Sequence, residues 1–73
     1  MNPRTRLAFP DVLSPEEMEL RMKEWELSGC TISRFVDNFD RCIRVRIEGL
    51  GVARYRHEGV LWRRTRKPNE QER

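Results

Sequence analysis

Residues 41–48 read Arg-Cys-Ile-Arg-Val-Arg-Ile-Glu, a stretch in which apolar and polar side chains alternate. Ile43, Val45 and Ile47 share one parity, whereas Arg44 and Arg46 share the other. Because successive side chains of a strand point to opposite faces of a sheet, this period of two predicts an antiparallel strand with one buried and one solvated face. We expect the two arginines on the solvated face.

Segments on either side of this stretch predict further strands. Residues 31–36 are rich in β-branched and aromatic side chains, and Asp and Asn residues in 37–40 are typical of a turn. Glycine-containing reversals separate two more expected strands, at residues 52–57 and 60–64. The sequence therefore predicts an antiparallel meander of three to four strands.

A helix is predicted immediately before the meander. Ser14 is suited to cap the helix, Pro15 to occupy its first position, and Glu17 to complete a capping box. Gly29 is a natural left-handed terminator, so we expect helix over residues 15–28. One helix packed on the meander makes the expected fold class α+β.

The predicted helix has two apolar sides. Met18, Met22 and Trp25 form one stripe at helical spacing, and Leu20 and Leu27 fall almost opposite. Two arrangements are open for the second stripe. Either the N-terminal segment covers it with its apolar side chains, Leu7, Phe9 and Val12, or the stripe is left free for a partner.

The length of 73 residues indicates a single small domain, which we place at residues 1–65. Residues 1–6 are expected to be loosely ordered, and residues 66–73, which contain no apolar side chain, are expected to form a disordered basic and polar tail. A chain this short buries roughly 60% of its unfolded surface, so a deep catalytic cleft is not expected.

Catalytic and metal-binding motifs are lacking in the sequence. His57 is the only histidine, no Cys-x-x-Cys pair occurs, and no glycine-rich phosphate loop appears. We therefore expect no enzyme activity, no metal site and no cofactor. Cys30 and Cys42 are expected to be small buried thiols rather than a disulfide, because neither a membrane span nor a secretory signal is seen and a cytoplasmic location is predicted.

Positive charge is concentrated in the second half of the chain. Residues 1–29 hold four basic and six acidic side chains, whereas residues 30–73 hold eleven basic and six acidic ones. Thirteen of the fifteen basic residues are arginine, whose planar guanidinium suits carboxylates and phosphates. If Ala53 and Tyr55 point inward, Arg54 and Arg56 join Arg44 on the solvated face.

We accordingly expect an interaction surface rather than a catalytic site. The candidate partner-binding residues are arginines of the meander, one tryptophan and the two leucines of the second helix stripe: Arg44, Arg46, Arg54, Arg56, Arg63, Arg64, Trp62, Leu20 and Leu27. Two alternatives stand beside this hypothesis. The arginines form only a solvated surface, or they interleave with Tyr55, Trp62, Phe35 and Phe39 as in sheets that stack single-stranded bases.

Taken together, the length, the arginine-rich meander and the early Leu-Ser-Pro-Glu-Glu helix start resemble small phage-encoded transcription regulators that bind host bacterial RNA polymerase. The resemblance implies a non-enzymatic protein that binds the N-terminal region of the β′ subunit in the bacterial cytoplasm, opposes σ-dependent initiation and promotes antitermination. We expect a monomer with this protein partner, a secondary nucleic-acid contact and no membrane association. The alternative function is a small nucleic-acid-binding module with an arginine-rich sheet face.

Overall fold

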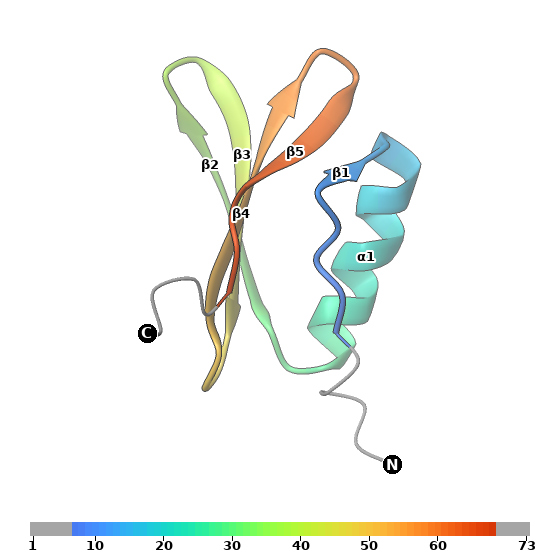
Figure 1. Cartoon of the computed structure of the whole chain (residues 1–73), viewed down its shortest axis with the longest axis vertical. Helices are drawn as coiled ribbons and strands as arrows, with labels where there is room; N and C mark the ends of the chain where they lie inside the picture. Colours follow the sequence, from blue (N-terminus) through green and yellow to red (C-terminus); the bar gives the residue numbers. More distant parts are fainter. Residues whose placement is uncertain (1–6, 69–73) are drawn as a thin grey trace.

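The computed structural model describes residues 7–68, which form one helix packed on a five-stranded antiparallel sheet (Figure 1). The elements, in chain order, are β1 (Val12–Leu13), α1 (Pro15–Leu27), β2 (Thr31–Asp37), β3 (Asp40–Ile47), β4 (Gly51–Glu58) and β5 (Leu61–Arg66). Their order across the sheet is β1-β5-β4-β3-β2. The α+β fold class is confirmed, and the expected meander corresponds to β2 through β5.

The expected number of three to four strands is slightly low, because β1 adds a fifth. Its two residues pair with β5, Val12 opposite Arg63 and Leu13 opposite Trp62. A two-residue strand shows no alternation in the sequence, so the period of two cannot reveal it. At the other end of the chain, β5 continues to Arg66, which therefore belongs to the sheet and not to the expected tail. Residues 1–6 and 69–73 lie outside the described residues.

The start of α1 follows the predicted capping box. The Ser14 hydroxyl accepts a hydrogen bond from the Glu17 backbone N–H (3.1 Å), and the Glu17 carboxylate accepts one from the Ser14 N–H (2.9 Å). Two of the four unpaired N–H groups at a helix start are often satisfied in this way. The helix ends at Leu27, and Gly29 follows with φ +94°. Within residues 7–68, no helix has the length and apolar character that crossing a membrane requires.

The core lies between α1 and one face of the sheet, here called the inner face. The predicted stripe of Met18, Met22 and Trp25 is buried there. It packs against the inward-pointing side chains of β3 and β4, which are Ile43, Val45, Ile47, Ala53 and Tyr55. Because Ala53 and Tyr55 are buried on the inner face, the alternate residues of β4 must point away from the helix.

The N-terminal segment completes this core and does not cover the second helix stripe. The Phe9 ring stacks on Trp25 with ring centres 5.1 Å apart, and the Trp25 indole N–H donates to the Ala8 carbonyl (3.1 Å). Leu20 and Leu27 are 64% and 89% exposed. Of the two arrangements considered for the second stripe, coverage by Leu7, Phe9 and Val12 is therefore wrong. The segment packs on Trp25 instead, because the Trp25 ring stacks with Phe9 and the Trp25 and Tyr55 side chains donate hydrogen bonds to carbonyls of the segment.

Both cysteines are free thiols and both are buried. Cys30 follows α1 and belongs to the core, and its burial raises the pKa of its thiol. Cys42 lies in β3 on the opposite side of the sheet, because it alternates with the inward-pointing Ile43 and shares the orientation of Arg44.

Candidate binding face of the sheet

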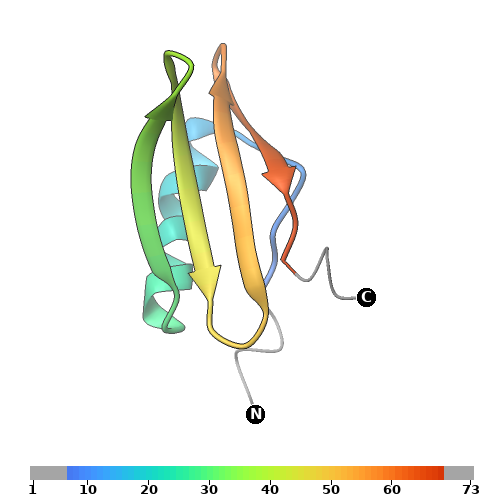
Figure 2. The ribbon, with the colours of Figure 1, turned by 90° about the vertical axis from the view of Figure 1, so that its left-hand side faces the viewer.

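The helix covers only one face of the sheet, and within residues 7–68 no second layer covers the other (Figure 2). The alternation along each strand puts the side chains of Arg44, Arg46, Arg54, Arg56 and Arg63 on this outer side, together with Phe35 of β2. We call these six residues the arginine face. Its composition follows from the buried positions of Val45, Ala53 and Tyr55 on the inner face.

Strand register brings the arginines of neighbouring strands together. Arg44 of β3 lies opposite Arg54 of β4, and Arg56 of β4 lies opposite Arg63 of β5. Residues directly opposite in an antiparallel pair have Cβ atoms about 4.5–5.5 Å apart. The like charges that neighbouring arginine side chains carry repel each other, so an anion bound between them is favoured.

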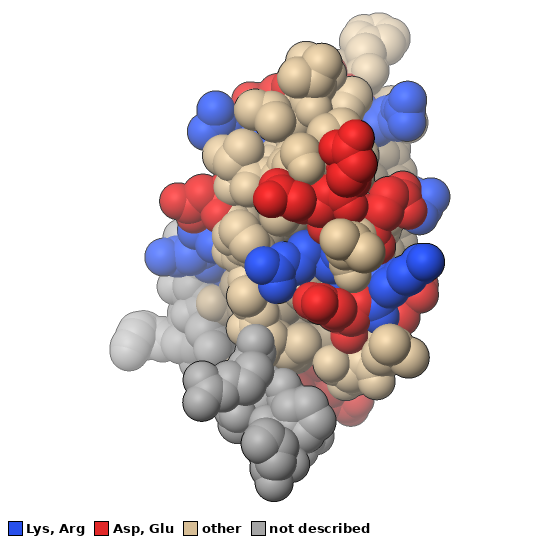
Figure 3. Space-filling view, turned by 90° about the vertical axis from the view of Figure 1, so that its right-hand side faces the viewer, with Lys and Arg blue, Asp and Glu red and all other residues tan. Residues whose placement is uncertain are grey.

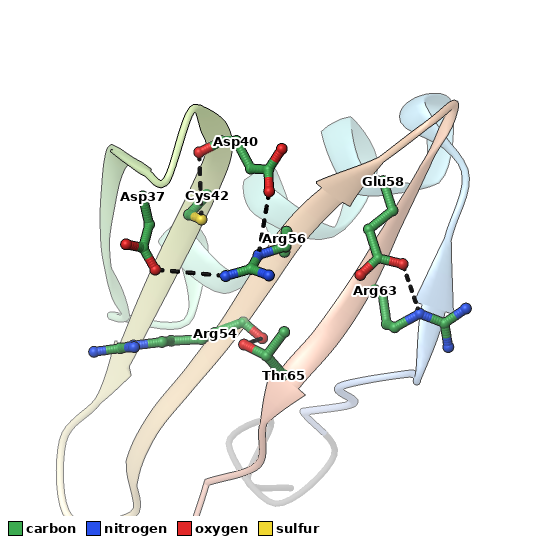
Figure 4. Close-up of polar contacts among 8 residues, drawn as sticks. All are labelled: Asp37, Asp40, Cys42, Arg54, Arg56, Glu58, Arg63 and Thr65. Carbon is green, nitrogen blue, oxygen red and sulfur yellow. Dashed lines mark hydrogen bonds and ion pairs between the residues drawn. The ribbon is translucent and has the colours of Figure 1, made fainter.

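Carboxylates neutralise the arginines nearest the hairpin turns (Figure 4). Arg56 lies 3.5 Å from an oxygen of Asp37 and 3.8 Å from an oxygen of Asp40, and Arg63 pairs with Glu58 at 2.9 Å. A hydrogen bond with Cys42 raises the pKa of Arg56, burial opposes this effect, and the charges of Asp40 and Asp37 raise the pKa further, so Arg56 keeps its positive charge. This end of the arginine face is already charge-balanced.

Three arginines further along the face have no such partner. Within residues 7–68, neither Arg44, Arg46 nor Arg54 forms an ion pair with a carboxylate. The guanidinium carbons of Arg44 and Arg54 lie 5.6 Å and 5.8 Å from the centre of the Phe35 ring, so both cations rest against its π-face. These contacts hold two guanidinium groups in place while leaving their charge uncompensated.

Two of the predicted candidates, Trp62 and Arg64, lie on the inner face. Arg64 is opposite Tyr55, its side chain is only 18% exposed, and it donates to the Phe9 carbonyl and to the Asp11 carboxylate. Trp62 packs against the core, with its ring 4.8 Å from that of His57. The adjacent Arg63 and Arg64 therefore belong to opposite faces of β5.

Leu20 and Leu27 are exposed on α1, which lies on the other side of the sheet from the arginine face (Figure 1). Acidic side chains gather over this side of the molecule (Figure 3). The exposed carboxylates of α1 are Glu16, Glu17, Glu19, Glu24 and Glu26. The nine predicted residues thus form one cluster of five arginines and two separate pairs, Trp62 with Arg64 and Leu20 with Leu27. The arginine face is positively charged, whereas the exposed side of α1 is negatively charged.

Sequence reasoning missed Arg66, which lies opposite Arg54 after a register shift between Arg54 and Tyr55. The strand-forming residue Thr65 was the available signal that β5 continues. It also missed the carboxylates that neutralise Arg56 and Arg63, because which side chains meet across neighbouring strands depends on the register of their pairing.

The arginine face offers planar, charged donors that suit carboxylate or phosphate groups. Within the described part of the chain, no group of three or more His, Cys, Asp or Glu side chains is placed to hold a metal ion. No protein-family model, curated protein or solved structure matches this chain.

Proposed function

We propose that this protein is a non-enzymatic transcription regulator that binds bacterial RNA polymerase through the arginine face, against an acidic surface of the polymerase. The observation that carries the proposal is the cluster of Arg44, Arg46 and Arg54, none of which has a carboxylate partner within residues 7–68. Unneutralised arginines at fixed positions favour a complementary surface and speed encounter with it.

The resemblance supplies the partner and the outcome of binding. On this proposal the contact lies in the N-terminal region of the β′ subunit, and binding opposes σ-dependent initiation and promotes antitermination. The protein then acts in the bacterial cytoplasm, where its partner is found. Leu20 and Leu27 lie on the opposite side of the molecule and are not part of this contact.

Single-stranded nucleic acid is the second candidate ligand. The guanidinium groups of Arg44 and Arg54 lie over the Phe35 ring, and arginine planes on an open sheet are used to stack unpaired bases. Phosphate contacts would make such binding steeply dependent on salt concentration.

The test is titration of wild type and the Arg44→Glu/Arg46→Glu variant against core RNA polymerase, single-stranded DNA and duplex DNA, each at two salt concentrations. We expect polymerase affinity to fall by at least about 30-fold, the equivalent of about 2 kcal/mol, with the thermal transition retained. Exposed arginines without ion pairs contribute little to stability, so the fold should tolerate both reversals.

The matched control is Arg21→Glu/Lys23→Glu, which makes the same change in net charge with residues of α1, outside both the arginine face and the groove described below. It should retain polymerase binding. Unchanged polymerase affinity in the Arg44→Glu/Arg46→Glu variant, or equal losses in both variants, would contradict the proposal. Loss confined to the DNA titrations would instead favour the nucleic-acid function.

A further inference from the structure

A second surface lies between α1 and the inner face of the sheet, close to the β2–β3 and β4–β5 turns. A groove of about 480 Å³ opens there. The β2–β3 and β4–β5 hairpins diverge toward the top of Figure 1. Its lining includes the apolar side chains Met18, Met22, Ile43 and Trp62. Pockets of roughly 300–1,000 Å³ with apolar walls accept ligands of substantial size, so this groove has room for a bulky side chain.

The charged groups that line the groove are mainly positive. Arg34 and Arg41 are both exposed there, and Glu19 is the single acidic residue of the lining. Within residues 7–68, neither arginine forms an ion pair, and the Arg34 guanidinium contacts only a weak acceptor, the Met22 sulfur at 3.7 Å. The groove is therefore suited to a ligand that is both apolar and anionic.

The turn between β2 and β3, whose flanking residues Val36 and Arg41 line the groove, carries an unusual aromatic residue. Phe39 has φ +73°, follows Asn38 with φ +58°, and is 96% exposed. A turn with two positive φ angles favours Asn-Gly, and a bulky residue in the second position is strained. Phe39 gains no packing in return within the described residues, which points to a contact with another molecule.

The open edge of the sheet favours an extended ligand. β2 pairs with β3, and within residues 7–68 no strand pairs with its other edge. Free strand edges bind extended segments by adding a strand, with alternate side chains entering neighbouring pockets. A second copy of this chain would bring another Arg34 to the edge, whereas an acidic segment brings opposite charge.

We propose that the groove binds an extended, acidic segment of a partner protein. A bulky apolar side chain of that segment enters the groove against Met22 and Trp62, its carboxylates pair with Arg34 and Arg41, and Phe39 packs on the segment from the turn. This inference does not rest on the function proposed for the arginine face, because Phe35 is the one residue that the two sites share and no arginine belongs to both.

The probe is the peptide acetyl-Asp-Glu-Phe-Leu-Asp-Glu-amide, titrated into the isotope-labelled full chain and followed by NMR. Two control peptides replace either the four acidic residues by lysine or the Phe-Leu pair by Ser-Ser. We expect the acidic apolar peptide to shift the Trp62 indole and Val36 amide signals and both control peptides to bind at least about tenfold more weakly. Equal binding by the lysine peptide, or shifts confined to the arginine face, would overturn the proposal.

Two variants test the residues assigned to the groove. Arg34→Glu/Arg41→Glu should weaken peptide binding by about tenfold or more, whereas Arg44→Glu/Arg46→Glu should leave it within about twofold. Phe39→Gly relieves the strained turn, so it should raise the melting temperature while weakening the peptide. Peptide affinity unchanged in both Arg34→Glu/Arg41→Glu and Phe39→Gly would overturn the site.

Discussion

The hydroxyl of Tyr55 donates a hydrogen bond of 2.7 Å to the carbonyl of Pro10, which lies 45 positions earlier in the chain. The same tyrosine ring stacks on Trp25 with ring centres 5.8 Å apart. Trp25 in turn donates to the Ala8 carbonyl. Residues 8–10 are thus fixed by donors from both the helix and the sheet, and the N-terminal segment is a structural part of the core.

Tyr55→Phe should lower the free energy of unfolding by about 1–3 kcal/mol, because it leaves the Pro10 carbonyl without its donor while keeping the ring. In a domain of this size each kcal/mol corresponds to a shift of about 4–8 °C in melting temperature. The measurement is thermal unfolding followed by circular dichroism. Ser33→Ala, which alters an exposed hydroxyl on β2, is the control and should melt like wild type. Equal melting temperatures for Tyr55→Phe and wild type would mean that the Tyr55–Pro10 hydrogen bond does not stabilise the fold.

Stability should also fall at alkaline pH through Tyr55. Burial raises the pKa of its hydroxyl above the usual value of 10.0, despite the opposing effect of Arg64. The folded state therefore favours the neutral phenol. Its stabilising contribution is fully present below about pH 10 and is lost as the pH rises further.

Tyr55→Phe isolates this effect, because all other titratable groups are the same in the two proteins. The difference in melting temperature between wild type and Tyr55→Phe should shrink as the pH rises from about 10 to about 12. A difference that stays constant across this range would show that Tyr55 ionises equally easily in the folded and unfolded states.

The helix and the four longer strands were predictable because each is specified locally. The Ser14–Glu17 capping box and the alternation in β3 are properties of short sequence stretches, and both appear in the structure. The position of the N-terminal segment was not predictable in the same way. It depends on donors from Trp25, Tyr55 and Arg64, which are brought together only by the complete fold.

The same limit applies to the candidate site. Period-two alternation correctly placed Arg44, Arg46, Arg54 and Arg56 on the outer side of the sheet. It also assigns Arg63 and Arg64 to opposite faces, but which of the two points outward depends on the pairing of β4 with β5. The prediction that both are partner-binding residues therefore could not distinguish the exposed Arg63 from the largely buried Arg64.

Ser14→Ala should lower the free energy of unfolding by about 1 kcal/mol, because it removes the acceptor for the Glu17 N–H. Ser14→Asp should restore most of the loss, since aspartate is an equally good N-cap and its charge is favourable at a helix start. Chemical denaturation of the three proteins measures both changes. Ser14→Ala and Ser14→Asp losing the same stability would mean that capping is not the role of this side chain.

The neighbouring residues Arg63 and Arg64 should respond in opposite ways to the same substitution. Arg64→Gln removes the donors to the Phe9 carbonyl and the Asp11 carboxylate, both in the N-terminal segment, and should destabilise the fold by about 1–3 kcal/mol. Arg63→Gln removes a single exposed ion pair with Glu58 and should change stability by no more than about 1 kcal/mol.

Hydrogen exchange of the N-terminal segment separates this explanation from a general loss of stability. Because Arg64 anchors residues 9–11, Arg64→Gln should increase exchange at the Asp11 amide more than at the Val45 amide in the centre of the sheet. Arg63→Gln should change neither. Equal increases at Asp11 and Val45 in Arg64→Gln would mean that this arginine supports the sheet as a whole, and the anchoring role assigned to it would be wrong.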